Sequence, residues 1–127
     1  MKNKALILDR DGVINRVHIK DGKPYPPKSV SELEILPDVS NALRELKKLG
    51  YLLIVVTNQP DVGRGTQERK VVEKIHDALT SHLPLDAIYT CYHGNDGECE
   101  CRKPKPGMLK QASLDYNIDL SKSFLVG

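Results

Sequence analysis

The length, composition and charge of the chain are those of an ordinary globular domain and exclude several classes of protein. Its 127 residues suffice for one domain, 1–127, that buries about two-thirds of the surface of the unfolded chain. A formal net charge of +2 is too small to indicate a nucleic-acid partner. No apolar run is long enough to span a membrane, and the first residues lack the pattern of a signal peptide, so we expect a cytoplasmic protein.

The predicted elements begin with a strand and a long connection. Residues 4–9 form a continuous apolar run, which is typical of a strand in the middle of a parallel sheet. Residues 15–37 are polar and rich in proline, and we predict a long, irregular and functional connection there. A helix follows over 37–50, which Asp38 or Ser40 can cap and a glycine ends.

The rest of the chain continues the alternation of strands and helices. We predict strands over 51–57 and 86–91, and the start of a further strand over 123–127. Helices are predicted over 66–82, with Thr66 as the cap, and over 104–117. This alternation predicts parallel βαβ units in an open, doubly wound α/β sheet with helices on both faces, and leaves no room for a large cap domain. Ligands bind such sheets beyond the carboxyl ends of the strands, where Asp9, Thr57 and Cys91 fall.

Two aspartates one residue apart, Asp9 and Asp11, end the first predicted strand. Alternate strand positions share a face, and Gly12 tolerates the backbone of a sharp turn that would let both carboxylates converge. Close carboxylates repel unless a cation lies between them or one is protonated. With Mg²⁺ and a phosphate present, one would serve as a nucleophile and the other would transfer protons. The alternative is a surface turn that Asp and Gly merely shape.

The cysteines of the chain cluster in one short segment. All three lie within eleven residues together with a histidine, in the pattern C-x-H-x5-C-x-C formed by Cys91, His93, Cys99 and Cys101. Four such ligands suit tetrahedral Zn²⁺ and close its coordination shell, so we predict a structural zinc site. A rigid zinc loop would fix the direction of Arg102 and Lys103, which follow it. The alternative is a set of reduced, unrelated cysteines.

Three motifs together resemble those of the haloacid dehalogenase-like (HAD) phosphohydrolases. The segment DRDGVIN resembles motif one, VVTNQ resembles motif two and CRKPKPGM resembles motif three, in the order of the family and next to the expected strands and helix. The cysteine loop before motif three is similar to that of one subgroup, the D-glycero-D-manno-heptose 1,7-bisphosphate phosphatases and histidinol-phosphate phosphatase domains. The resemblance implies a HAD-like Rossmannoid fold.

The resemblance implies catalytic roles for the two aspartates. Asp9 would attack phosphorus and become an aspartyl phosphate. Asp11 would protonate the leaving alcohol and then activate the water that releases phosphate. The Asp9 side chain and the Asp11 carbonyl oxygen would also bind a catalytic Mg²⁺.

The resemblance implies further roles for residues of motifs two and three. Thr57 would donate its hydroxyl to the phosphoryl oxygens, with backbone N–H groups near Asn58 assisting. Lys103 would neutralise charge between Asp9 and the phosphate, and Arg102 would reach a substrate hydroxyl or phosphate. The alternatives are that Thr57 and Asn58 only punctuate the end of a strand, and that Lys103 is an exposed surface lysine.

The family also carries a fourth motif, an acidic pair just after a strand similar to FLVG. The chain ends at Gly127, before that position, so we expect the C-terminal part to be missing and Mg²⁺ to depend on water and phosphate for its other ligands. The resemblance implies a Mg²⁺-dependent phosphatase acting on a small-molecule sugar bisphosphate, most closely the heptose compound. The alternatives are a histidinol-phosphate phosphatase and a catalytically inactive HAD-like binding module. We expect the complete protein to be a monomer.

Overall fold

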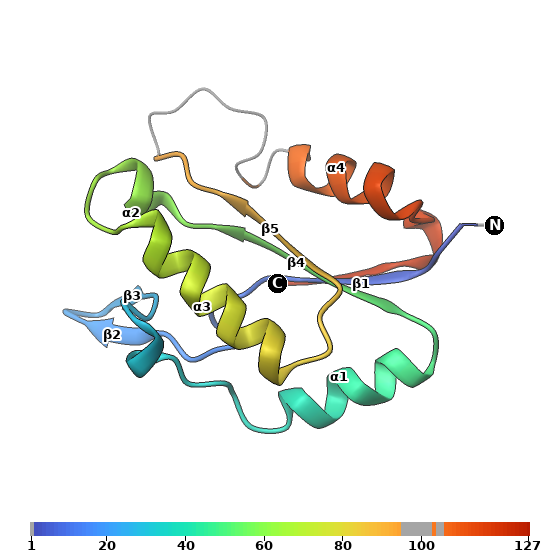
Figure 1. The fold of residues 1–127 in the computed structure, drawn as a ribbon, viewed down its shortest axis with the longest axis horizontal. Helices are drawn as coiled ribbons and strands as arrows, with labels where there is room; N and C mark the ends of the chain where they lie inside the picture. Colours follow the sequence, from blue (N-terminus) through green and yellow to red (C-terminus); the bar gives the residue numbers. More distant parts are fainter. Residues whose placement is uncertain (1, 95–102, 104–105) are drawn as a thin grey trace.

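The computed structural model describes residues 2–94, 103 and 106–127, and its central feature is a parallel β-sheet (Figure 1). Four strands pair in the order β5-β4-β1-β6, and every pairing is parallel. In chain order these strands are β1 (Ala5–Leu8), β4 (Leu52–Asn58), β5 (Ala87–Cys91) and β6 (Phe124–Val126). The predicted open parallel sheet is confirmed.

Helices cover both faces of this sheet, as predicted. The helices are α1 (Val39–Lys48), α2 (Pro60–Gly63), α3 (Arg69–His82) and α4 (Gly107–Tyr116), with short 3-10 helices η1 (Val30–Glu32) and η2 (Leu120–Lys122). Figure 1 shows α4 on one face and α1 and α3 on the other. No large cap domain interrupts the described part of the fold. None of the helices in the described ranges is long and apolar enough to cross a membrane.

Alternate residues of the central strands enter two separate hydrophobic cores, one on each face of the sheet. The core beneath α1 and α3 includes Leu6, Leu8, Leu53, Val55, Leu43, Ile75 and Leu79. The core beneath α4 includes Ala5, Ile7, Ile54, Val56, Met108 and Ala112. Because both faces are covered, β1 and β4 carry continuous apolar runs and not an alternating pattern.

The predicted caps of the first two long helices are wrong. Asp38 precedes α1 but makes no side-chain capping bond. Its φ is +67°, whereas a cap residue reaches the first amides of a helix from an extended backbone. Ser40 lies inside the helix. Helix α3 begins at Arg69, and the Thr66 hydroxyl instead donates a hydrogen bond of 3.2 Å to the carbonyl oxygen of Asp61. The short helix α2 precedes this turn, and its four residues are too few to show a helical period.

Residues 15–37, which we predicted to be irregular, contain a two-stranded antiparallel hairpin. Strands β2 (His18–Lys20) and β3 (Lys23–Tyr25) flank a turn in which Asp21 and Gly22 have φ +51° and +75°. Two positive φ angles suit a two-residue hairpin turn, for which Asp-Gly is a strong signal. The dipeptide could have revealed the hairpin, but the flanking residues are mostly exposed and show no apolar alternation.

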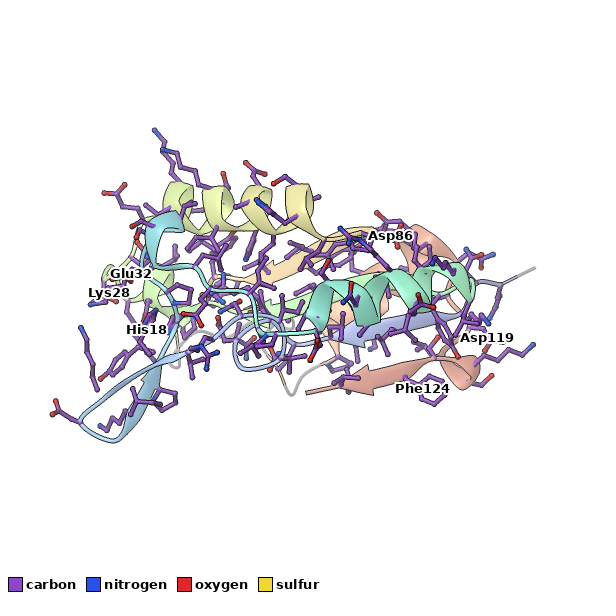
Figure 2. All side chains as sticks on the ribbon, turned by 90° about the horizontal axis from the view of Figure 1, so that it is seen from below. His18, Lys28, Glu32, Asp86, Asp119 and Phe124 are labelled. Carbon is purple, nitrogen blue, oxygen red and sulfur yellow. The ribbon has the colours of Figure 1, made fainter. Side chains whose placement is uncertain are left out.

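Strand β6 forms one edge of the sheet and exposes apolar side chains. Phe124 and Leu125 are 60% and 66% exposed. Figure 2 shows Phe124 at one end of the molecule, and His18, Lys28 and Glu32 near the hairpin at the other.

Candidate active site

The candidate catalytic residues gather where the central strands end. Strand β1 ends directly before Asp9, β4 ends at Asn58 just after Thr57, and β5 ends at Cys91. Asn58 pairs with Cys91 in the register of β4 and β5. The prediction that Asp9, Thr57 and Cys91 lie at the carboxyl edge of the sheet is confirmed.

Asp9 is paired with a lysine far away in the sequence. The Lys103 ammonium donates to Asp9 Oδ1 over 2.7 Å and to the carbonyl oxygen of Val56 over 3.0 Å. The backbone N–H of Arg10 donates to the same Asp9 oxygen over 2.9 Å. Both charged side chains are about one-third exposed, at 35% for Asp9 and 30% for Lys103. Lys103 is therefore not the free surface lysine of the alternative interpretation, and the pair remains accessible to a ligand.

Asn58 fixes the main chain of this lysine. Its side-chain oxygen accepts a hydrogen bond of 3.0 Å from the backbone N–H of Lys103, and its side-chain nitrogen donates one of 3.3 Å to the Lys103 carbonyl oxygen. The sequence suggested that backbone N–H groups near Asn58 assist phosphate binding, whereas the structure gives its side chain a positioning contact to Lys103. No local sequence pattern could have revealed this contact.

A tight turn follows Asp9 and contains the second aspartate, Asp11. Gly12 has φ +83°, and its N–H donates to the Asn15 carbonyl oxygen over 2.8 Å. The N–H of Ile14 donates to the Arg10 carbonyl oxygen over 2.8 Å. The left-handed backbone at Gly12 is the conformation that the sequence predicted for this turn.

The Asp11 carboxylate is held by several donors. Its Oδ1 accepts hydrogen bonds from Arg10 Nε at 3.0 Å, Arg10 Nη2 at 2.8 Å and Asn15 Nδ2 at 3.0 Å. Its Oδ2 accepts one from Gln59 Nε2 at 3.0 Å. The side chain is 22% exposed, so it remains reachable from solvent. These four hydrogen bonds hold the carboxylate in one orientation.

Gln59 links the second aspartate to the predicted threonine. Gln59 is 4% exposed, and its Nε2 donates both to Asp11 Oδ2 and, over 2.9 Å, to Thr57 Oγ1. Because a hydroxyl can accept and donate at once, Thr57 keeps its own hydrogen for another acceptor. Sequence analysis assigned no role to Gln59, although it is the last residue of the motif VVTNQ.

A buried arginine and a buried histidine lie beside Asp11 and were also missed by sequence analysis. Arg10 is 1% exposed, and its Nη1 lies 3.0 Å from His76 Nε2 on α3. Burial lowers the pKa of His76 from 6.5 to about 4; the Arg10 charge acts in the same direction and the Asp11 charge opposes it. The only sequence signal was the position of His76, four residues after Val72 and three before Leu79 on the apolar face of α3.

The cysteine segment is described only in part. Cys91 is fully buried, and its Sγ lies 3.5 Å from His93 Nδ1. The other two predicted zinc ligands, Cys99 and Cys101, and the predicted substrate residue Arg102 lie outside the described residues. Within the described ranges, no group of three or more His, Cys, Asp and Glu side chains could hold a metal ion. The four-ligand zinc site stays a prediction.

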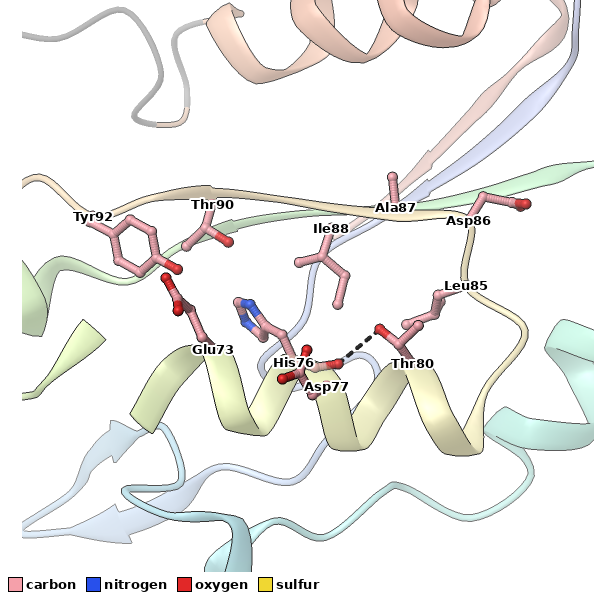
Figure 3. Close-up of a pocket in the computed structure, with 10 residues that line it drawn as sticks. All are labelled: Glu73, His76, Asp77, Thr80, Leu85, Asp86, Ala87, Ile88, Thr90 and Tyr92. Atoms are coloured by element: carbon pink, nitrogen blue, oxygen red, sulfur yellow. Dashed lines mark hydrogen bonds between the residues drawn. The ribbon is translucent and has the colours of Figure 1, made fainter. Parts of the chain in front are cut away.

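Two hollows lie near these residues. One, of about 570 Å³, borders the Asp9–Lys103 pair and the last residues of the chain, Leu125 to Gly127. The other, of about 430 Å³, lies between α3 and β5, where Figure 3 shows Glu73, Asp77 and Asp86 around it. We take the first as the candidate substrate site, because it contains both the candidate nucleophile and a cation.

The oxygen atoms at this site are compatible with Mg²⁺. Both hydrogen bonds that Asp9 accepts within the described residues go to Oδ1, so Oδ2 remains available as a ligand. Carboxylate and carbonyl oxygens are the ligands that Mg²⁺ prefers, and it readily takes water and phosphate for the rest. The oxygen atoms are therefore compatible with the metal that the sequence predicted, and the Asp9 carboxylate and the Asp11 carbonyl oxygen remain its predicted protein ligands.

Comparisons with known proteins point to one group of enzymes. Residues 7–127 match the family described as polynucleotide kinase 3 phosphatase. The D-glycero-beta-D-manno-heptose-1,7-bisphosphate 7-phosphatase of Haemophilus influenzae is 40% identical over 98% of this chain and 71% of its own length. The enzyme of that name from Pseudomonas aeruginosa is 39% identical, over 100% of this chain and 71% of its own length.

Solved structures agree with these relatives. The D,D-heptose 1,7-bisphosphate phosphatase of B. bronchiseptica, complexed with magnesium and phosphate, matches with a TM-score of 0.82 and 36% identity over 98% of this chain and 69% of its own. A HAD-like phosphatase structure from Mesorhizobium loti matches with a TM-score of 0.82 and 27% identity, over 99% of this chain and 63% of its own.

Proposed function

Because this chain belongs to the polynucleotide kinase 3 phosphatase family and is a HAD-type phosphatase, we propose that it hydrolyses a sugar bisphosphate through an aspartyl-phosphate intermediate. The substrate that we favour is D-glycero-D-manno-heptose 1,7-bisphosphate, with loss of the 7-phosphate, the activity for which relatives 40% and 39% identical are named. The observation that carries the proposal is the accessible Asp9–Lys103 pair at the end of β1, with Asp11 two residues further on.

The first step forms a bond between an Asp9 carboxylate oxygen and phosphorus. As that bond forms, the bond between phosphorus and the sugar oxygen breaks, and Asp11 gives its proton to the departing alkoxide. Lys103 stabilises the ionised Asp9 carboxylate from 2.7 Å away and offsets the charge of the incoming phosphate. Thr57 donates its remaining hydroxyl hydrogen to a phosphoryl oxygen, and Arg102 contacts the substrate.

The second step regenerates the enzyme. Asp11, now ionised, takes a proton from a water molecule whose oxygen attacks phosphorus, and the bond between Asp9 and phosphorus breaks to release inorganic phosphate. In this proposal the donors around Asp11 hold its carboxylate in one orientation for both proton transfers. Mg²⁺ bound by Asp9 and the Asp11 carbonyl oxygen would offset the negative charge that carboxylate and phosphoryl oxygens bring together.

We also propose that Cys91, His93, Cys99 and Cys101 bind a structural zinc ion. The short distance between Cys91 and His93 supports the idea, because it brings two candidate ligands together beside the end of β5. In this proposal zinc has no chemical role and only orders the segment that leads to Lys103.

The test of the proposed function is Mg²⁺-dependent phosphate release from D-glycero-D-manno-heptose 1,7-bisphosphate, with the Asp9→Asn protein measured beside it. We expect release by the unaltered protein and none by the variant, because an amide cannot form the phosphoenzyme. Histidinol phosphate serves as the competing substrate. Faster release from histidinol phosphate would overturn the choice of substrate, and no release from either would overturn the proposed activity in favour of a binding module.

A further inference from the structure

Arg10 and His76 form a buried pair next to the proposed acid and base of the reaction. We propose that the two are positioning residues, with His76 orienting the Arg10 guanidinium and Arg10 orienting the carboxylate of Asp11 for proton transfer. The inference rests on the proposed function, since it adds two residues to the machinery of the same site. Neither residue would touch the substrate.

Each of the three guanidinium nitrogens of Arg10 contacts one of these two partners. Arg10 presents Nε and Nη2 to Asp11 Oδ1, at 3.0 and 2.8 Å, and Nη1 to His76 Nε2 at 3.0 Å. Only 1% of Arg10 is exposed, and a buried guanidinium is costly unless its donors are satisfied. Contacts at both edges of the planar group hold it in one orientation, and its two bonds to Oδ1 hold that oxygen of the carboxylate in place.

The histidine must be neutral to take part in this arrangement. Arginine has donors only, so His76 Nε2 accepts the hydrogen bond and the ring proton resides on Nδ1. Burial and the adjacent guanidinium favour this neutral form, as the lowered pKa of about 4 reflects. Neutral His76 thus gives the buried Arg10 guanidinium a hydrogen-bond acceptor on the side that faces away from Asp11.

Helix α3 holds His76 rigidly. Its neighbours Ile75 and Leu79 are fully buried in the core beneath α1 and α3. The Thr80 hydroxyl donates to the His76 carbonyl oxygen over 2.8 Å, and Figure 3 shows the imidazole directed from α3 toward β5. His76 and Arg10 therefore connect the orientation of Asp11 to the hydrophobic core, in addition to the turn that contains Asp11.

The arrangement also distinguishes the two oxygens of Asp11. Oδ1 accepts the two bonds from Arg10 and one from Asn15, whereas Oδ2 accepts a single bond from Gln59. Oδ2 is thus the oxygen with capacity left to carry and transfer a proton. Loss of the Arg10 contacts would let the carboxylate rotate and exchange these two oxygens.

The experiment compares two substrates whose leaving groups differ in their need for a proton. The sugar phosphate releases an alkoxide, which must be protonated as it leaves, whereas p-nitrophenyl phosphate releases a stable phenolate, which need not be. The value of kcat/KM reports the steps up to formation of the phosphoenzyme. A misplaced acid therefore lowers kcat/KM for the sugar phosphate alone, whereas general damage to the site lowers it for both.

We expect His76→Leu, which removes the acceptor, to lower kcat/KM for the sugar phosphate at least about tenfold more than for p-nitrophenyl phosphate. His76→Gln supplies a neutral acceptor and should restore most of the loss. Arg10→Lys keeps the charge but loses the planar fork, and it should show the same selective loss. His82→Leu, a matched change at the exposed end of α3, should leave both values unchanged.

Equal losses for both substrates, or no loss for either, would overturn the positioning role. If His76→Leu does not fold, as judged by circular dichroism, the ratio for Arg10→Lys decides in the same way. In each of these outcomes the unaltered protein is still active, so the proposed function stands. An unaltered protein that hydrolyses neither substrate would instead overturn the proposed function, and the inference with it.

Discussion

Lys103 meets Asp9 across 94 positions of the sequence, and its ammonium is the cation that the structure places against the candidate nucleophile. Lys103→Met keeps the length of the side chain and removes this charge. We expect kcat/KM for phosphate release to fall about 100-fold or more, because preorganised charge stabilises the phosphoryl transfer. Lys110→Met, on the exposed side of α4, is the matched control and should behave as the unaltered protein. Unchanged turnover of Lys103→Met would contradict the role.

His76 makes the stability of the protein depend on pH in a defined window. Its folded pKa of about 4 lies below the ordinary value of 6.5, so between these values the unfolded chain binds a proton that the folded chain does not. The free energy of unfolding should therefore fall as the pH is lowered from 6.5 to about 4, by up to roughly 3 kcal/mol from this group.

Urea unfolding at pH 7 and pH 4.5 measures this effect. Other groups also titrate in this range, so the comparison is with His76→Gln, which cannot be protonated there. We expect the variant to lose less stability on acidification than the unaltered protein. An equal loss in both proteins would show that His76 is not held neutral in the fold.

The residues of the site differ in how far the sequence could reveal them. Asp9, Asp11, Thr57 and Lys103 lie in short motifs next to strand or helix ends, where local pattern and position are informative. His76 and Gln59 reach Arg10 and Asp11 from 66 and 48 positions away. No spacing rule connects residues so distant, and only the packing of α3 and β4 against β1 brings them together.

Helix α2 lies against the segment that leads into the cysteine loop, and Gly63 permits the approach. A Cβ atom there would stand 2.5 Å from the Gly94 nitrogen and 2.6 Å from the Tyr92 oxygen, both main-chain atoms. Gly63→Ala should therefore separate the two segments and lower the free energy of unfolding by roughly 1–3 kcal/mol, measured by urea denaturation.

Gly65→Ala is the comparison for this change. Gly65 lies two residues later and has φ +79°, but no atom lies within 4 Å of its Cβ position. Its replacement should cost only about 1 kcal/mol of backbone strain. Equal effects of the two substitutions on the free energy of unfolding would mean that the contact between Gly63 and residues 92–94 does not limit the size of the side chain there.

The elements of the fold were predictable where burial is complete on both sides. Strands β1 and β4 are continuous apolar runs because helices cover each face, and α1 and α3 show the expected apolar stripe. The hairpin β2–β3 was missed because little of it is buried and its pattern carries no period. Helix boundaries shifted because backbone conformation, as at Asp38, and not residue type alone decides whether a side chain can cap a helix.

At the scale of the whole molecule, the proposed zinc site ties the cysteine segment to the sheet. Purified protein should contain about one zinc ion per chain, measured by elemental analysis, as expected for a closed four-ligand site. Cys91→Ser removes the ligand that also lies in the core beneath α4, and should lower both zinc content and the midpoint of thermal unfolding. Full zinc content in the variant would contradict the ligand set.

The unequal lengths of β1 and β4 have a consequence of their own. The register pairs Leu8, the last residue of β1, with Val55, and β4 continues three residues further, to Asn58. The sheet thus has a step at this edge, where the Val56 carbonyl oxygen accepts from the Lys103 ammonium. One residue inserted into β1 would extend the strand over the step and displace Asp9 from the cation, whereas the exposed hairpin turn could lengthen freely. The protein should therefore tolerate an insertion in the turn between β2 and β3 much better than one in β1.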